Sequence, residues 1–358
     1  MDSVAGRKGA IMPHSPGGAR RYFPSGACLT YHTPLFVYPC WSCHMLPPEF
    51  LSRLEMTCPP DLLSGALASF AGKEAVAFRI NRLSVAAPEP VLAELAGMGI
   101  ACAPVAWAQA AGVWAYTCPQ EQREILTYSS AASLGSIYIQ SLSSMLAPIL
   151  LAPQPEEWVL DLAAAPGGKT ILLAEMMGNE GKISAVEPVS ARYHRLKANL
   201  ARMGVSNTQT YLKDGRVVGS LKPDCFDRVM LDAPCSSESR FKTWDPGSWE
   251  HWSPAKVSEC AKKQKRLILS AFDALKQGGT LMYCTCSFAP EENELIVDHL
   301  LKKREGVRLL PLSLDLPNVR PGLGEWKGKP LAAACQETRR VWPTGEMDGF
   351  YLALIAKA

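Results

Sequence analysis

Two short motifs place cysteines where thiol chemistry could occur. Residues 231–236 read LDAPCS and contain Cys235, while residues 283–287 read YCTCS and contain Cys284 and Cys286. A thiolate is a strong nucleophile, and covalent catalysis divides one difficult step into easier ones. A single cysteine at a strand end is more often a small buried hydrophobic residue. The two motifs therefore have to be interpreted from the segments around them.

A glycine turn and a series of acidic residues indicate a cofactor pocket. Residues 161–170, DLAAAPGGKT, combine small side chains with two glycines, which lets the backbone approach a ligand closely. The turn matches neither GxGxxG nor the GxxxxGK[ST] phosphate loop. Asp161, Glu187, Asp214 and Asp232 end successive predicted strands and could accept hydrogen bonds there. S-adenosylmethionine fits such a site, because its ribose diol, adenine amine and ammonium group are all donors. No metal site is expected.

The segments that must position these residues alternate between strand and helix. Such alternation from Trp158 onward predicts a parallel sheet covered on both faces. If the strands that precede Cys235 and contain Cys286 are neighbours, both thiols overhang the same pocket. The predicted strands are residues 158–163, 182–188, 208–213, 226–234, 279–287, 307–312 and 349–356.

The segment before this sheet has the composition of a separate small α/β module. We expect it to occupy residues 46–126, with the catalytic domain at residues 127–358. The elements expected in and after the module are helices at 46–55 and 91–99, a strand at 75–85 and a helix at 137–153.

The first 45 residues differ from the remainder of the chain. They are rich in Gly, Pro and Ser, and we interpret them as a disordered leader or a translated upstream stretch before Met45. Their four basic residues against one acid account for the whole net charge of +3. Cys40, Cys43 and His44 have the spacing of a haem-attachment motif, but a motif this short can arise by chance. The twelve cysteines are scattered, which favours reduced thiols and a cytoplasmic location. No stretch approaches the ~20 apolar residues of a membrane span.

The motifs together resemble the Sun/Nop family of RNA cytosine methyltransferases, which act at carbon 5, and the bacterial 16S ribosomal RNA branch looks nearest. The resemblance covers roughly residues 46–358 and rests on FRIN, YIQSLSSM, LDLAAAPGGKT, DGR, LDAPCS, YCTCS and DGFYLA, in this order. It implies a Rossmann-like class I methyltransferase fold with a seven-stranded, mostly parallel sheet. It also implies a monomer that uses S-adenosylmethionine to methylate RNA, with ribosomal RNA favoured and transfer RNA as the alternative.

The resemblance assigns roles to residues of this chain. Cys286 is the expected nucleophile that adds to carbon 6 of cytosine, and Cys235 is expected to assist product release. Lys169 could lower the pKa of a thiol in the pocket. Cys284 departs from the family, which commonly has Ser there, and is interpreted as a packing residue. The expected cofactor-binding residues are Ala163, Ala164, Ala165, Pro166, Gly167, Gly168, Lys169, Glu187, Asp214 and Asp232.

Several segments could contact RNA through cations and stacking aromatic rings. The main candidate is residues 239–254, a loop that its own tryptophans could equally hold in place. Further candidates, each of which could instead be structural, are Arg79 and Arg82 with Trp107, Trp114 and Tyr116, the basic run Lys256, Lys262, Lys263, Lys265 and Arg266, and the pair Arg339–Arg340.

Alternative functions stay open at this point. A DNA-type cytosine methyltransferase would use Cys235 as its nucleophile and would not need Cys286, and a small-molecule or protein methyltransferase would need neither thiol. The non-catalytic alternative is an RNA-binding ribosome assembly factor with a vestigial S-adenosylmethionine pocket, against which the intact pair of thiols and the complete glycine turn argue.

Overall fold

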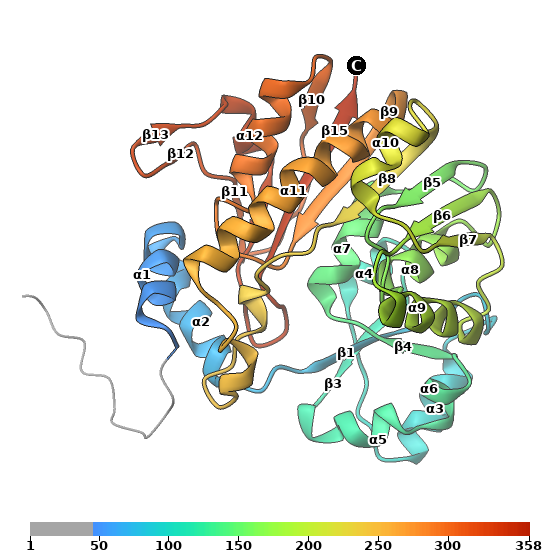
Figure 1. Ribbon diagram of the computed structural model, residues 1–358. Helices are drawn as coiled ribbons and strands as arrows, with labels where there is room; N and C mark the ends of the chain where they lie inside the picture. Colours follow the sequence, from blue (N-terminus) through green and yellow to red (C-terminus); the bar gives the residue numbers. More distant parts are fainter. Residues whose placement is uncertain (1–45) are drawn as a thin grey trace, which may run out of the picture. The chain divides into compact units, whose positions relative to one another are not determined.

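Seven strands of the large sheet, some parallel and some antiparallel, lie at the positions that the strand–helix alternation of the sequence predicts. The computed structural model describes residues 46–358 (Figure 1). Strands β7, β6, β5, β8 and β9 are parallel in this order, and β15 pairs antiparallel with β9. Strand β10 pairs antiparallel with β15. The bounds are β5 Trp158–Asp161, β6 Lys182–Val186, β7 Thr208–Tyr211, β8 Phe226–Asp232, β9 Leu275–Thr285, β10 Val307–Leu310 and β15 Phe350–Lys357.

The sheet has nine strands, two more than expected. The additional strands are β11 (Val319–Pro321) and β14 (Arg339–Val341), which extend the edge beside β15. Each has three residues, which is too short for an alternating pattern to be recognised in the sequence. A separate hairpin follows from β12 (Glu325–Trp326) and β13 (Lys329–Pro330).

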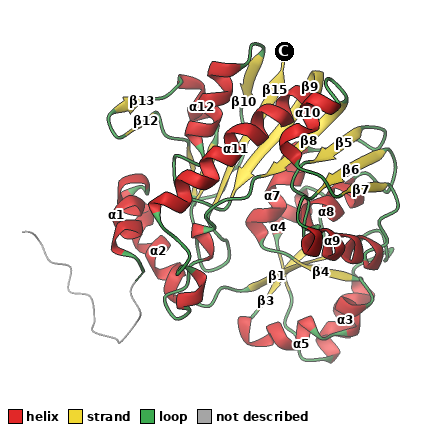
Figure 2. Ribbon diagram, viewed as in Figure 1, coloured by secondary structure: helices red, strands yellow, loops and turns green. Residues whose placement is uncertain are grey.

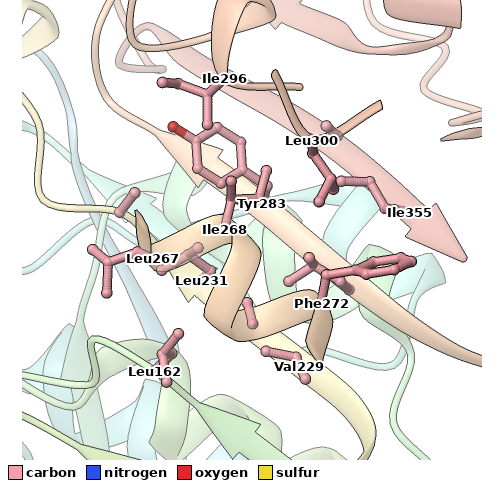
Figure 3. Close-up of a cluster of buried hydrophobic side chains, with 14 of the residues drawn as sticks. Leu162, Val229, Leu231, Leu267, Ile268, Phe272, Tyr283, Ile296, Leu300 and Ile355 are labelled. Carbon is pink, nitrogen blue, oxygen red and sulfur yellow. The ribbon is translucent and has the colours of Figure 1, made fainter. Parts of the chain in front are cut away.

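Helices cover both faces of this sheet, as Figure 2 shows for α11 lying across the strands. On one face, α11 (Pro254–Ala274) and α12 (Glu294–Lys303) bury apolar side chains such as Phe272 and Ile296 against β8, β9 and β15, where Tyr283 of β9 lies (Figure 3). On the other face lie α7 (Leu142–Leu151), α8 (Gly168–Met176) and α9 (Ser190–Arg202). Full burial of one such side chain stabilises the fold by about 1.5–3 kcal/mol. Short α10 (Val218–Leu221) precedes β8.

A smaller antiparallel sheet precedes the catalytic sheet. Its order is β2-β3-β1-β4, and its last strand comes from residues 137–139, which lie beyond position 126. The expected helix at 137–153 is therefore wrong in its first residues, because α7 begins only at Leu142. The bounds are β1 Val76–Ile80, β2 Ala103–Pro104, β3 Ala115–Cys118 and β4 Ile137–Ile139, with α3 Glu89–Gly97, α4 Ala106–Ala110, α5 Arg123–Thr127 and α6 Ser130–Ser133.

Buried contacts attach the small sheet and the first two helices to the catalytic sheet. Arg79 on β1 is fully buried and forms an ion pair with Glu175 on α8. Arg79 therefore cannot reach RNA, and that expectation is wrong. Helices α1 (Pro48–Thr57) and α2 (Pro60–Ala71) contribute Phe50 and Phe70 to an aromatic cluster with Phe241 and Phe288.

The proposed leader and the Cys40, Cys43 and His44 set lie outside the described residues. Among residues 46–358, no helix is both long and apolar enough to cross a bilayer. Within the same range, no group of three or more His, Cys, Asp and Glu side chains is arranged to hold a metal ion.

Candidate active site

The glycine turn joins β5 to α8 in a backbone conformation that requires glycine. Gly167 has a φ of 114°, and a Cβ there would lie 3.1 Å from Leu196 Cδ1. Asp161 accepts a hydrogen bond from Thr170 Oγ1 at 2.7 Å and is buried, so burial raises its pKa to about 6. The other carboxylate oxygen of Asp161 has no partner within the described chain. The turn thus lets a ligand approach the backbone closely, and one carboxylate oxygen of Asp161 remains available as an acceptor beside it.

A cavity of about 720 Å³ opens at the carboxyl ends of the parallel strands. Its size is in the range of ligand sites, and its position is where open α/β sheets bind ligands. Glu187 after β6 and Asp214 after β7 line it together with Asp232 at the end of β8. Glu187 also accepts from the Val189 amide at 2.9 Å. Three carboxylates therefore offer hydrogen-bond acceptors to one ligand, which fits a donor-rich molecule such as S-adenosylmethionine.

The two thiols lie at the same end of this cavity. Because β8 and β9 are parallel neighbours, with Asp232 in register with Cys284, the segments that follow both strands run side by side. The amide of Ser239 donates to the Cys286 carbonyl at 3.0 Å. Cys235 Sγ lies 3.3 Å from Cys286 Sγ, within sulfur hydrogen-bond distance. The expectation that both thiols meet at one pocket agrees with this geometry.

The surroundings of the two sulfurs differ. The hydrogen bond between the sulfurs lowers the pKa of Cys286 to about 7 against the opposing effect of burial, and the charge of Arg240 lowers it further. The pKa of Cys235 is well above its usual value, because of the same bond, burial, and the charges of Cys286 and Glu292. The two sulfurs can share one proton, and the cation of Arg240 favours the thiolate on Cys286.

Arg240 is a site residue that the sequence interpretation assigned only to RNA contact. It lies in the loop after Cys235, lines the cavity, and has its own pKa raised most by Cys286 and then by Asp232 and Cys235. The expected cation was Lys169, but its Nζ bonds Ser144 Oγ and Asp232 Oδ2, each at 2.7 Å. The signal for Arg240 that the sequence offered was its position five residues after Cys235.

Cys284 lies on β9, which ends at Thr285, and Cys286 directly follows the strand. Cys284 is fully buried, and its Sγ lies 3.7 Å from Asp232 Oδ1. Burial, followed by the charge of Asp232, raises its pKa well above the usual thiol value. Cys284 is therefore an unreactive packing residue, as expected.

A second cavity of about 550 Å³ adjoins the first and reaches toward the small sheet. The two share Ser144, Lys169, Asp232 and Arg240 in their linings. At the rim of the second cavity, the side chain of Trp244 is 58% exposed. The cavities thus form one cleft from the thiols to an exposed aromatic ring.

Buried contacts anchor the loop of residues 239–254 to the rest of the fold, while the side chain of Trp244 remains exposed. Trp252 is buried and donates to Glu238 at 2.9 Å, and Trp249 packs against the same cluster. The Thr243 amide donates to the Phe70 carbonyl at 2.9 Å. The structural interpretation of this loop therefore holds for Trp249 and Trp252, and RNA contact stays a prediction for Trp244.

The other RNA candidates divide into buried and exposed side chains. Tyr116 is buried, whereas Arg82 is exposed and packs over Trp114. Arg340 is buried and forms a bidentate ion pair with Glu294, in which both nitrogen–oxygen distances are 2.6 Å. Of the basic run on α11, Lys263 lines the first cavity, although its Nζ also bonds Glu259.

The predicted site residues gather around the two cavities with one exception. Gly167 shapes the turn without lining either cavity, whereas Ala164 and Gly168 line the second. The first cavity is lined by Ala163, Ala165, Pro166, Lys169, Glu187, Asp214, Asp232, Cys235 and Cys286.

Comparisons with known proteins point in one direction. The family model described as 16S rRNA methyltransferase RsmB/F matches residues 148–356. The tRNA (cytosine(49)-C(5))-methyltransferase of Pyrococcus abyssi is 38% identical over 71% of this chain and 79% of its own. Ribosomal RNA small subunit methyltransferase F of Pectobacterium carotovorum is 39% identical over 70% of this chain, but over only 52% of its own. A methyltransferase homolog from Pyrococcus horikoshii has a crystal structure with a TM-score of 0.69 and 31% identity, covering 87% of this chain and all of its own.

Proposed function

Because the chain belongs to the 16S rRNA methyltransferase RsmB/F family, we propose that it methylates carbon 5 of a cytosine in RNA through a covalent adduct on Cys286. The observation that supports this most is the 3.3 Å contact between Cys235 and Cys286 at the end of the cofactor-sized cavity. Ribosomal RNA is the favoured substrate and transfer RNA the alternative, since relatives acting on each match this chain.

S-adenosylmethionine, when bound, supplies an electrophilic methyl group. The residues that fit it are the acceptors Glu187, Asp214 and Asp232 around the first cavity, with the backbone of residues 163–168. Gly215 lies beside Asp214 in the same surface. A Cβ at position 215 would lie 2.8 Å from the Leu162 carbonyl oxygen. A side chain at position 215 would therefore disturb the wall beside Asp214.

The thiols perform the covalent part of the reaction. The Cys286 thiolate adds to carbon 6, and the electron pair displaced from the 5,6 double bond makes carbon 5 nucleophilic. Forming this thioether removes the negative charge on Cys286, which is one cause of the raised pKa of Cys235. Cys235 then ionises more easily, and once it has lost its own proton to solvent its thiolate can accept the proton that leaves methylated carbon 5. The electrons of that C–H bond restore the double bond and expel the Cys286 sulfur.

The alternative functions receive less support. A DNA-type mechanism needs Cys235 as the nucleophile, but the charge of Arg240 favours the thiolate on Cys286, and the relatives that match this chain are RNA methyltransferases. An assembly factor without activity would not require a thiol with a pKa of about 7 in a cofactor-sized cavity.

Adduct formation with labelled methyl donor and RNA tests the proposal. Cys286→Ala is expected to abolish methyl transfer and leave donor binding intact, whereas Cys235→Ala is expected to accumulate a protein–RNA adduct on a denaturing gel. Bisulfite sequencing of RNA from cells with and without the gene identifies the modified base. Loss of transfer in Cys235→Ala with full activity in Cys286→Ala would overturn the assignment.

A further inference from the structure

Two buried glutamates lie directly behind the cysteines and are not used by the mechanism above. Glu292 accepts hydrogen bonds from the Ser236 amide at 2.9 Å and from the Ser236 hydroxyl. It also accepts from Ser287 Oγ at 2.9 Å. Ser236 directly follows Cys235, and Ser287 directly follows Cys286. One carboxylate therefore binds the residue after each thiol.

Glu238 holds the same two segments from the other side. Its Oε2 accepts from the Phe288 amide at 2.7 Å and the Ala289 amide at 2.9 Å. It also lies 3.0 Å from Ser287 Oγ, whose single proton is shared between Glu238 and Glu292. Glu238 itself belongs to the loop after Cys235, so these bonds cross from that loop to the segment after Cys286. The hydroxyls of Ser236 and Ser287 also lie 3.1 Å apart.

Stability alone does not explain two carboxylates in this position. Glu238 and Glu292 are both buried, and neither forms an ion pair within residues 46–358. Burying a carboxylate without a neighbouring cation costs desolvation free energy, which hydrogen bonds offset only in part. Burial and then the charge of Glu238 raise the pKa of Glu292 to about 7. Buried charged groups without a counter-ion, which weaken a fold, are expected at functional sites.

We propose that Glu238 and Glu292 are positioning residues that lock the two cysteine loops together and so keep the sulfurs of Cys235 and Cys286 in contact. The inference rests on the proposed function for its catalytic meaning, but the contact between the sulfurs can be tested without it. If the lock is removed, Cys286 loses the donor that stabilises its thiolate, and Cys235 moves away from the adduct it must resolve.

The network suggests an informative pair of variants at position 292. In Glu292→Gln, the amide oxygen can accept from the Ser236 amide and Gln264 Nε2, which lies 3.0 Å from Glu292 Oε2. The amide NH₂ group can donate to the two serine hydroxyls, which rotate freely. Glu292→Gln therefore keeps the lock, whereas Glu292→Ala removes it. Glu291→Ala is the matched control, because Glu291 precedes Glu292 but binds Arg53, away from the thiols.

The rate of iodoacetamide alkylation of Cys286 against pH, located by peptide fragmentation, reports the sulfur contact directly. We expect the midpoint to rise by about 1 unit in Glu292→Ala, toward that of Cys235→Ala, and to stay unchanged in Glu292→Gln and Glu291→Ala. Methyl transfer should fall about 10²-fold in kcat for Glu292→Ala, with little change in KM for RNA. An unchanged midpoint in folded Glu292→Ala would overturn the inference.

A milder variant covers the case in which Glu292→Ala does not fold. Replacing both Ser236 and Ser287 by Ala removes the hydroxyl bonds and keeps the backbone ones, so a smaller rise of the midpoint in the same direction is expected. No rise in this folded variant would also contradict the inference. If the unmodified protein shows the low midpoint but no methyl transfer to RNA, the proposed function fails while the positioning role stands.

Discussion

Lys169 Nζ lies 2.7 Å from Asp232 Oδ2, which ties the first turn of α8 to the end of β8, three residues before Cys235. Burial disfavours the ammonium form of Lys169, but Asp232, Cys284 and Asp161 together outweigh it, so the pKa of Lys169 lies above its usual value. The ion pair thus fixes one positive and one negative charge between the glycine turn and the thiols.

Replacing Lys169 by Met should leave Asp232 without its cation at the cavity wall. We expect methyl transfer to fall about 10²-fold or more, because preorganised charge at the reacting centre is lost. Lys197→Met, which changes an exposed lysine of α9, serves as the control. Equal activity of the two variants in a methyl-transfer assay would contradict a role for the Lys169–Asp232 pair.

The pH dependence of methyl transfer should follow the ionisation of Cys286. The thiolate is the reactive form, so activity should be lost as the pH falls below about 7 and should level off above it. In Arg240→Ala, removal of the cation should move the midpoint to higher pH. Arg240→Lys retains a cation and should keep the midpoint near that of the unmodified protein. A midpoint that does not respond to Arg240→Ala would exclude the assigned electrostatic role.

Trp244 is expected to stack on a base of the bound RNA at the rim of the second cavity. Loss of one stacking contact costs about 1–3 kcal/mol, so Trp244→Ala should weaken RNA binding roughly 5- to 150-fold. Trp244→Phe should retain most of the affinity. Tyr128→Ala is a suitable control, since Tyr128 is also exposed but lines neither cavity. Filter binding at fixed salt measures the effect, and equal losses at both positions would reject the assignment.

The buried pair of Arg79 and Glu175 should matter for stability. Removing one partner leaves an uncompensated buried charge, so Arg79→Ala should lower the free energy of unfolding by about 3–5 kcal/mol. The double variant with Arg79→Met and Glu175→Leu should recover much of this loss. Urea denaturation of both variants measures the difference. A stability of Arg79→Ala equal to that of the unmodified protein would show that the pair is not formed.

The amino-acid sequence by itself determined the parts that depend on neighbouring residues. Alternating apolar segments predicted the seven main strands, and Gly167 with Gly168 predicted the turn, because few other residues permit that backbone. The motifs around Cys235 and Cys286 predicted a thiol pair at one sheet edge, since strand ends in a parallel sheet share that edge.

Tertiary structure decided what depends on residues distant in the chain. The partner of Arg79 is 96 positions away, so its change from an RNA candidate to a buried anchor could not be predicted locally. The two sulfurs are 51 positions apart, and only the packing of their loops brought Arg240 close to Cys286 and Glu292 close to Cys235. Charge and burial act through space, so the division of roles between the two thiols arose only when the chain was folded.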